Sequence, residues 1–258
     1  MKLSYIMQTY LKGDYPSAAS EPKKKFIRAV NSVLNQQYLE IELVIVADGC
    51  ETTKMMYSSI KEWKNDERIK FAFVDKNESE TMHNNGKYYR GVPREVGRAL
   101  ATGDIITYLD ADDFALPTHA PILLGHWAQA LSQNKDYEFC LNHAWYDNVA
   151  LPKLYSDRPE FKYIKHDVDE IEIEGLQSKW AVARPLPNIM VQNTNLISHR
   201  NWLPVRWKDS TSAPEDATFC NTYLGNFGRD KAFSIAKPIY VRCHAYDGKN
   251  GNKHFWDW

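Results

Sequence analysis

The sequence has few cysteines, and no arrangement of them is typical of a metal site. The four residues, Cys50, Cys140, Cys220 and Cys243, are far apart, and no Cys-X-X-Cys pair occurs. This spacing argues against a structural zinc site. Reduced, buried thiols in a cytoplasmic protein are the simplest interpretation.

The sequence also lacks an excess of charge and a long apolar run. Its 32 Lys and Arg residues against 33 Asp and Glu residues give a net charge of −1. The overall charge therefore gives no attraction to nucleic acid or to an anionic membrane. No apolar run approaches the roughly 20 residues of a membrane-spanning helix, and residues 1–10 resemble a strand rather than a leader peptide. We expect no membrane span and a cytoplasmic location.

What the sequence does contain is an alternation of apolar strands and amphipathic helices over its first half. Strands are predicted at residues 3–9, 42–47, 69–74 and 105–109. Helices are predicted from Pro22, over residues 52–64, and from Pro93 to a C-terminal Gly103. This order predicts an α/β fold with a doubly wound sheet.

The pattern is looser after about residue 136. Short strands are predicted at 138–145, 189–197 and 232–243, with a helix over 214–224. No sharp linker separates the two parts. We therefore expect one domain, residues 1–258, with halves at 1–135 and 136–258.

A short apolar run that ends in carboxylates is the most informative segment. Residues 105–109 read Ile-Ile-Thr-Tyr-Leu, and Asp110, Asp112 and Asp113 follow. Because side chains alternate across a strand, we expect Asp110 and Asp112 to point the same way, about 7 Å apart. Carboxylates at a strand's carboxyl end suit Mg²⁺ or Mn²⁺ and a bound phosphate. The alternative is a solvated acidic turn before a helix near Pro117.

Six segments, in order, resemble motifs of family 2 glycosyltransferases with the GT-A fold. They are Gln8-Thr9-Tyr10, residues 27–36 (IRAVNSVLNQ), residues 42–50 (ELVIVADGC), residues 93–113 (PREVGRALATGDIITYLDADD), Pro214-Glu215-Asp216, and residues 240–244 (YVRCH). The fourth resembles the Ala-Arg-Asn-X-Gly helix that leads into the Asp-X-Asp metal motif. The chain departs from the family's pattern at Ala47 and Glu95, where the family has Asp and Asn.

The resemblance implies a nucleotide-binding sheet followed by a C-terminal acceptor-side lobe. It implies transfer of a sugar from a nucleotide-sugar, a UDP-sugar, to a hydroxyl acceptor, with Mn²⁺ or Mg²⁺ as cofactor. The Gln-X-X-Arg-Trp motif of processive synthases is absent. A single-addition, inverting enzyme fits best.

The resemblance also assigns the donor-binding residues, which are Thr9, Tyr10, Asp48, Arg94 and Asp110. Asp48 lies between a strand and a glycine, where its carboxylate can accept from a uracil N–H or a ribose hydroxyl; capping of the following helix is the alternative. Arg94 is a cation in a first helical turn, against the helix dipole, which suggests pairing with the diphosphate. The alternative is an exposed arginine.

The metal ligands implied are Asp110, Asp112, Asp113 and His244, although a lone histidine in a strand is often structural. Asp216, beside Glu215, is the implied catalytic base, since a sugar hydroxyl needs one to become a good nucleophile. Acids in a first helical turn are also ordinary dipole partners.

The acceptor is the least constrained part of the prediction. A saccharide or glycoconjugate is expected, and a hydroxymethylated base in phage DNA, in the host cytoplasm, is the minority option. Three segments, 178–188, 199–208 and 253–258, interleave Trp with basic residues, which suits stacking on sugars or bases but also a core. The alternative functions are a nucleotidyltransferase, which should carry a glycine-rich loop after the first strand, and a non-catalytic nucleotide-sugar binder.

Overall fold

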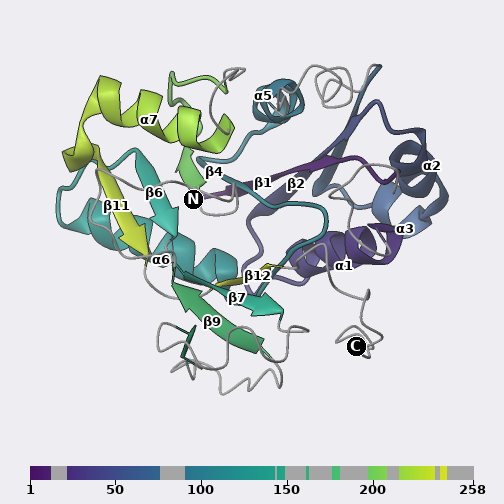
Figure 1. Ribbon diagram of the computed structural model, residues 1–258, viewed down its shortest axis with the longest axis horizontal. Coiled ribbons are helices and arrows are strands. Elements are labelled where there is room, and N and C mark those ends of the chain that lie inside the picture. The colour runs from purple at the N-terminus through teal and green to yellow at the C-terminus, as the bar shows by residue number, and fades with distance from the viewer. Residues whose placement is uncertain are drawn as a thin grey trace.

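The computed structural model is built around two β-sheets (Figure 1). It describes residues 1–12, 22–75, 91–142, 144–148, 161–162, 176–180, 197–207, 215–235 and 239–242. The larger sheet has seven strands in the order β11-β6-β10-β4-β1-β2-β3. Their bounds are β1 Leu3–Thr9, β2 Ile41–Asp48, β3 Ile69–Val74, β4 Ile105–Tyr108, β6 Phe139–Asn142, β10 Ile197–Arg200 and β11 Ala232–Ile235.

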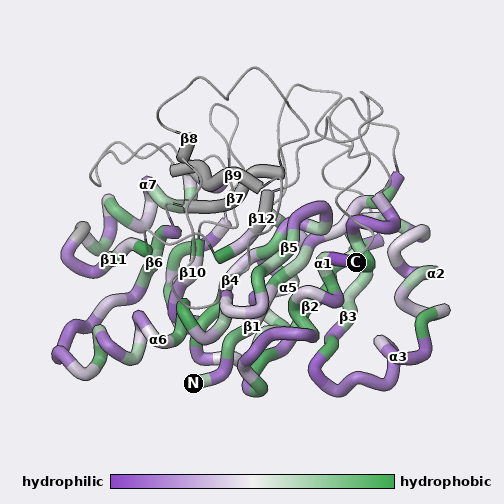
Figure 2. Tube along the Cα trace, turned by 90° about the horizontal axis from the view of Figure 1, so that it is seen from below, coloured by the Kyte–Doolittle hydropathy of each residue, from purple (hydrophilic) through white to green (hydrophobic). Residues whose placement is uncertain are grey.

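Strands β1 to β4 are mutually parallel, as the alternating pattern predicted. Only β10 among the seven runs the other way, antiparallel to both β4 and β6. The central strands are apolar on both faces, which a parallel sheet covered by helices requires. Figure 2 shows hydrophobic residues concentrated in these strands and hydrophilic residues on many of the connecting loops.

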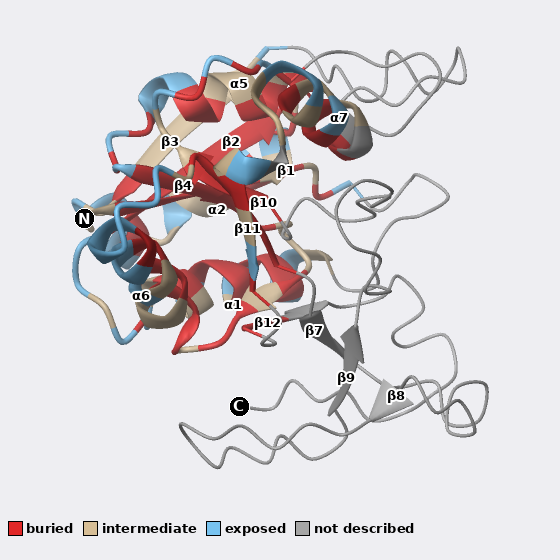
Figure 3. Ribbon diagram, turned by 90° about the vertical axis from the view of Figure 1, so that its left-hand side faces the viewer, coloured by how far each residue is buried: buried red, intermediate tan, exposed pale blue. Residues whose placement is uncertain are grey.

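Helices cover both faces of the large sheet, so the doubly wound prediction is confirmed (Figures 1 and 3). One face packs against α1, α3 and α6, and the other against α5 and α7. Alternate residues of β1 serve the two cores: Tyr5 and Met7 join the first, and Ile6 joins the second. The helix bounds are α1 Pro22–Leu34, α2 Glu51–Ser59, α3 Lys61–Lys64, α5 Gly91–Leu100, α6 His119–Ser132 and α7 Glu215–Phe227, with a short 3₁₀ turn at Arg229–Lys231.

The smaller sheet has five short strands in the order β5-β12-β7-β9-β8. Its first strand, β5, begins at Phe114, directly after the acidic residues, so this sheet starts beside the carboxyl end of β4. The bounds are β5 Phe114–Ala115, β7 Ala144–Asn148, β8 Phe161–Lys162, β9 Leu176–Trp180 and β12 Tyr240–Arg242.

A buried glutamate stabilises the amino-terminal edge of the large sheet. Glu42 accepts hydrogen bonds from the Ser4 hydroxyl at 2.5 Å and from Lys2 Nζ at 2.9 Å, and Lys70 Nζ lies 3.0 Å away. Burial by itself raises its pKa, but the hydrogen bonds from Ser4, Thr102 and Lys2 hold the pKa well below its usual range. The buried carboxylate of Glu42 therefore has its hydrogen-bond and charge partners within the protein.

Several predicted boundaries were wrong. The helix expected over residues 52–64 is broken at Ile60, whose backbone is extended (φ −90°, ψ 99°). The helix expected from Pro93 begins two residues earlier at Gly91 and ends at Leu100.

The later predicted strands also needed correction. The expected strands 138–145 and 232–243 are each two strands, and the members of each pair belong to different sheets. Of the strand expected at 189–197, only Ile197 is described, and it begins β10. The rest of that segment lies outside the described residues.

Candidate active site

Three of the predicted donor-binding residues lie at one edge of the large sheet. Strands β4, β1 and β2 are neighbours, and Asp110, Thr9 and Asp48 lie at or just after their carboxyl ends. The chain passes from β1 to β2 on one side, whereas β4 pairs with β1 on the other. Ligands of open α/β sheets bind at such a switch point.

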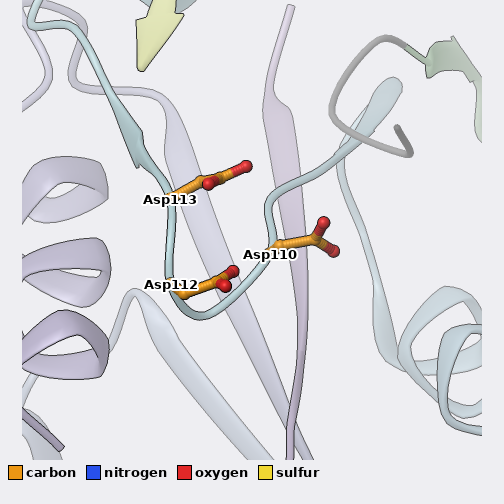
Figure 4. A group of neighbouring side chains, drawn as sticks. All are labelled: Asp110, Asp112 and Asp113. Carbon is orange, nitrogen blue, oxygen red and sulfur yellow. The ribbon is translucent and has the colours of Figure 1, made fainter. Parts of the chain in front are cut away.

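The three aspartates lie in a turn that brings their carboxylates together (Figure 4). Strand β4 ends at Tyr108, and the Asp113 N–H donates to the Asp110 carbonyl oxygen at 3.1 Å. One carboxylate oxygen from each of the three residues lies within 4.8 Å of the others. The expectation that a strand's alternation aligns Asp110 and Asp112 was therefore wrong, because the turn does this instead.

This donor set fits a divalent cation. Two oxygens bound at about 2.1 Å to one Mg²⁺ lie at most about 4.2 Å apart. The carboxylate oxygens of the turn lie within 4.8 Å of one another, which is close to that separation. Asp113 is buried, while Asp110 and Asp112 are half-buried and leave room for ligands other than protein. Mg²⁺ and Mn²⁺ favour such partly open sets of hard oxygens, completed by substrate phosphate.

Arg28 of α1 supports the turn, and the sequence reasoning did not identify it. Its Nη2 donates to the Asp112 carbonyl oxygen at 2.7 Å, and its guanidinium lies 4.7 Å from the centre of the Phe114 ring. The residue belongs to the helix segment that carried part of the family resemblance. Its position in that segment was the only signal available in the sequence.

Asp48 ends β2 and is 3% exposed. The next residue, Gly49, has φ 61°, and its N–H donates to the Val74 carbonyl at 2.9 Å, which turns the chain sharply towards α2. The N-cap position of α2 belongs to Cys50, which makes no side-chain capping bond. Asp48 is therefore not the N-cap residue of α2, which was the alternative role expected for it.

The hydroxyl of Thr9 serves the protein itself. It lies 3.0 Å from the Thr53 hydroxyl of α2, and its side chain is buried. The adjacent Tyr10 is half-buried, and the Leu11 N–H contacts Cys50 Sγ at 3.2 Å. Thr9 therefore joins β1 to α2.

Arg94 is buried, so the alternative of an exposed arginine is wrong. Its side chain is 2% exposed, and its guanidinium carbon lies 4.5 Å from the centre of the Trp207 ring. Arg98, one turn later, has a structural role. It donates to the carbonyl oxygens of Leu203 and Val205 at 2.7 and 2.5 Å.

Asp216 is the second residue of α7 and is 6% exposed. It shares a helix face with Phe219, three residues later, and the Phe219 ring stacks on Trp207 with centroids 4.2 Å apart. Burial, followed by the nearby Asp216 carboxylate, raises the pKa of Cys220. The side chain of Glu215 and all of His244 lie outside the described residues.

Of the tryptophans in the basic-aromatic segments, two are described in detail. Trp207 is buried, whereas Trp202 is 58% exposed. Three cysteines, Cys50, Cys140 and Cys220, are buried free thiols. Within the described part of the chain, no helix is both long and apolar enough to cross a membrane.

A mainly parallel sheet, covered by helices on both faces and with acids at its switch point, is an α/β fold of the GT-A type. The chain belongs to glycosyl transferase family 2, whose family model matches residues 20–165, more than half of its length. The fold is similar to that of S. aureus TarS, residues 1–349, which was solved in complex with UDP-GlcNAc. The TM-score is 0.55, the identity is 17%, and the match covers 100% of this chain and 61% of that one.

Two curated relatives illustrate the sequence similarity. An uncharacterized glycosyltransferase of Methanocaldococcus jannaschii is 29% identical over 167 residues, which cover 63% of this chain and 49% of the relative. A putative colanic acid biosynthesis glycosyl transferase of Escherichia coli, WcaA, is 30% identical over 137 residues, 52% of this chain and 44% of the relative. The matches span about half of these relatives or less.

Proposed function

We propose that the protein transfers a sugar from a UDP-sugar to a hydroxyl group of an acceptor, with Mn²⁺ or Mg²⁺ at the acidic turn. The observation that carries the proposal is the cluster of three carboxylates within 4.8 Å at the switch point of a family 2 domain. The UDP-GlcNAc in the TarS complex supports a uridine nucleotide as donor. A divalent ion bound by Asp110, Asp112 and Asp113 would neutralise charge on the diphosphate.

The donor is recognised from three sides of the switch point in this proposal. Asp48 accepts a hydrogen bond from the uracil or the ribose, and the backbone at Thr9 and Tyr10 borders the nucleoside. Arg94 offers its guanidinium to the diphosphate, for which a planar fork of N–H donors is suited. The burial of Arg94 supports its role, because a buried charge gains more from an opposite charge than an exposed one does.

Asp216 acts as the general base, and Glu215 is its neighbour in the motif. As the acceptor oxygen attacks the anomeric carbon, its proton passes to the Asp216 carboxylate. The bond from that carbon to the diphosphate oxygen breaks, and UDP leaves with the bonding electrons. Attack from the side opposite to the leaving group inverts the anomeric configuration. His244 is proposed as a further ligand of the metal or diphosphate.

The acceptor is proposed to be a saccharide or glycoconjugate, and the reaction a single addition. A hydroxymethylated DNA base remains the minority option. The net charge of −1 supports the saccharide, since it gives no general attraction for DNA.

Calorimetry of the full chain with UDP, GDP and CDP, each with Mn²⁺ and with Mg²⁺, tests the donor part of the proposal. UDP should bind most tightly, and EDTA should abolish the binding. UDP at about 100 times its Kd should add about 2.7 kcal/mol to the free energy of unfolding. Failure to bind UDP with either metal contradicts the proposal. Binding of UDP-sugars without release of UDP, across a panel of hydroxyl acceptors, indicates a binder instead of an enzyme.

A further inference from the structure

Trp207 contacts three elements that carry separate parts of the proposed site. Its ring lies 4.5 Å from the guanidinium carbon of Arg94 in α5 and stacks on Phe219 of α7 at 4.2 Å, with 12° between the planes. Its Nε1–H donates to the Tyr108 hydroxyl at 2.7 Å, and Tyr108 is the last residue of β4. The residue therefore joins the proposed diphosphate cation, the helix of the base, and the strand that leads into the acidic turn.

The backbone around Trp207 is held by the same helix that carries Arg94. The Trp207 N–H donates to Glu95 Oε1 at 2.6 Å, and Arg206 Nη1 donates to Glu95 Oε2 at 2.9 Å. Arg98 donates to the carbonyls of Leu203 and Val205. This accounts for Glu95 where the family has Asn, because a carboxylate can accept from Trp207 and Arg206 together.

The Tyr108 hydroxyl is also fixed from its other side. His199 Nε2 lies 2.8 Å from it, and His199 Nδ1 lies 2.8 Å from the Arg200 carbonyl oxygen, so Nδ1 carries the proton and donates. Tyr108 then donates to Nε2 and accepts from Trp207. Every polar group in this buried chain has a partner, so the indole has one preferred orientation.

We infer that Trp207 is a positioning residue that fixes the guanidinium of Arg94 towards the donor diphosphate. A flexible arginine loses side-chain entropy when it binds a phosphate, and a rigid aromatic face reduces that loss before the donor arrives. The cation–π contact with Trp207 also stabilises the charge of the buried guanidinium. This inference rests on the proposed function, because it assumes that Arg94 contacts the diphosphate.

A double-mutant cycle on UDP affinity, measured by calorimetry with Mn²⁺, tests the inference. Trp207→Leu should weaken UDP binding about tenfold, and Trp207→Phe, which keeps an aromatic face, should stay within about threefold of the wild type. In an Arg94→Gln background, Trp207→Leu should have no further effect, because it acts only through Arg94. Trp127→Leu, a buried tryptophan of α6, is the control for general destabilisation and should leave UDP affinity unchanged.

The outcomes separate the two proposals. If the wild type binds no UDP, the proposed function fails and the inference fails with it. If the wild type binds UDP but Trp207→Leu binds equally well, or if its loss adds to that of Arg94→Gln, only the inference is overturned. If Trp207→Leu does not fold, Tyr108→Phe replaces it. This variant removes only the hydroxyl that orients the indole and should weaken UDP binding about threefold, and unchanged affinity would overturn the inference.

Discussion

At the scale of the residue, the site is an arrangement of charges that the fold has brought close together. Three carboxylates within 4.8 Å repel one another, and such a set is stabilised by a cation. The Arg28 side chain holds the Asp112 backbone in place from outside the turn. The shape of the turn is therefore held by contacts within the protein itself.

Replacing one of these carboxylates should separate metal binding from stability. Asp112→Asn removes a charged ligand, which typically contributes about 1.5–3 kcal/mol, so Mn²⁺ affinity should fall about 10- to 100-fold. Without metal the variant should unfold at the same temperature or a higher one, because a repulsive charge is gone. Mn²⁺ titration followed by electron paramagnetic resonance and thermal melts measure both effects. Glu67→Gln, an exposed carboxylate before β3, is the control. Unchanged Mn²⁺ affinity would contradict the metal site.

Nucleotide recognition is predicted to depend on Asp48. Asp48→Asn should weaken UDP binding by about 1–3 kcal/mol, the usual effect of losing a charged hydrogen bond. A thermal melt of the unliganded variant checks that it still folds. Calorimetry with UDP and Mn²⁺ gives the affinity, and a wild-type value would assign Asp48 a purely structural role.

Catalysis is predicted to depend on Asp216. Asp216→Asn should keep UDP affinity, because the donor is bound elsewhere, and should lower turnover by about 10²–10⁴, as expected for a positioned base. Steady-state rates with a confirmed donor and acceptor measure this loss. Near-wild-type turnover would leave Asp216 as a partner of the helix dipole.

At the scale of the element, the packing of α5 decides where Arg94 lies. Gly97 faces the sheet, and a Cβ there would lie 2.5 Å from Ile6 Cγ2 and 3.4 Å from Val46 Cγ2. Glycine is therefore required for the close approach of α5 to β1 and β2. The same helix carries Arg94, Glu95 and Arg98, so its distance from the sheet sets the position of the cation and of the 203–207 segment.

A pair of glycine substitutions tests this packing. Gly97→Ala should lower the free energy of unfolding by about 1–2 kcal/mol, because overpacking costs more than the gain in helix propensity. Gly125→Ala in α6, where a Cβ meets nothing within 4 Å, should instead raise it by up to about 1 kcal/mol. Urea unfolding of the two variants gives both values. Stabilisation by Gly97→Ala would contradict the close packing of α5.

At the scale of the whole molecule, two buried histidines link stability to pH. Burial lowers the pKa of His119 to about 3, and burial followed by the charge of Arg98 lowers that of His199 to about 3. Both are held neutral within the fold, His119 against the Tyr5 hydroxyl and His199 against Tyr108. The unfolded chain takes up protons at these groups near pH 6.5, whereas the folded chain does so only near pH 3.

Stability should therefore be complete above about pH 6.5 and decrease as the pH falls towards 3. Each histidine contributes a slope of at most about 1.4 kcal/mol per pH unit. His119→Asn, whose amide replaces Nδ1 against Tyr5, should reduce the slope between pH 6.5 and 4.5 and leave it unchanged above pH 7. Urea unfolding at a series of pH values measures this. A slope equal to that of the wild type would mean that His119 is protonated in the folded protein.

The sequence alone determined the motif residues and the element order of the first half, because both are local properties. Apolar periodicity was sufficient to predict strands β1 to β4 and that helices lie between them, but not the break at Ile60 or the start of α5 at Gly91. The acidic run Asp110 to Asp113 and the short motifs near Asp48, Arg94 and Asp216 each consist of consecutive residues, so they could be recognised in the sequence. That Asp48 and the acidic run lie at the same edge also followed, since parallel strands end at the same edge of a sheet.

What only the tertiary structure decided are the contacts between residues far apart in the chain. The apolar periodicity of the sequence does not predict the contact of Trp207 with Arg94 or the hydrogen bond from Arg28 to the Asp112 carbonyl oxygen. It also does not predict that the Thr9 hydroxyl contacts α2. The physical reason is that these contacts depend on how helices pack on the sheet. That packing is set by side-chain volumes such as the missing Cβ of Gly97, and it arises only when the whole chain has folded.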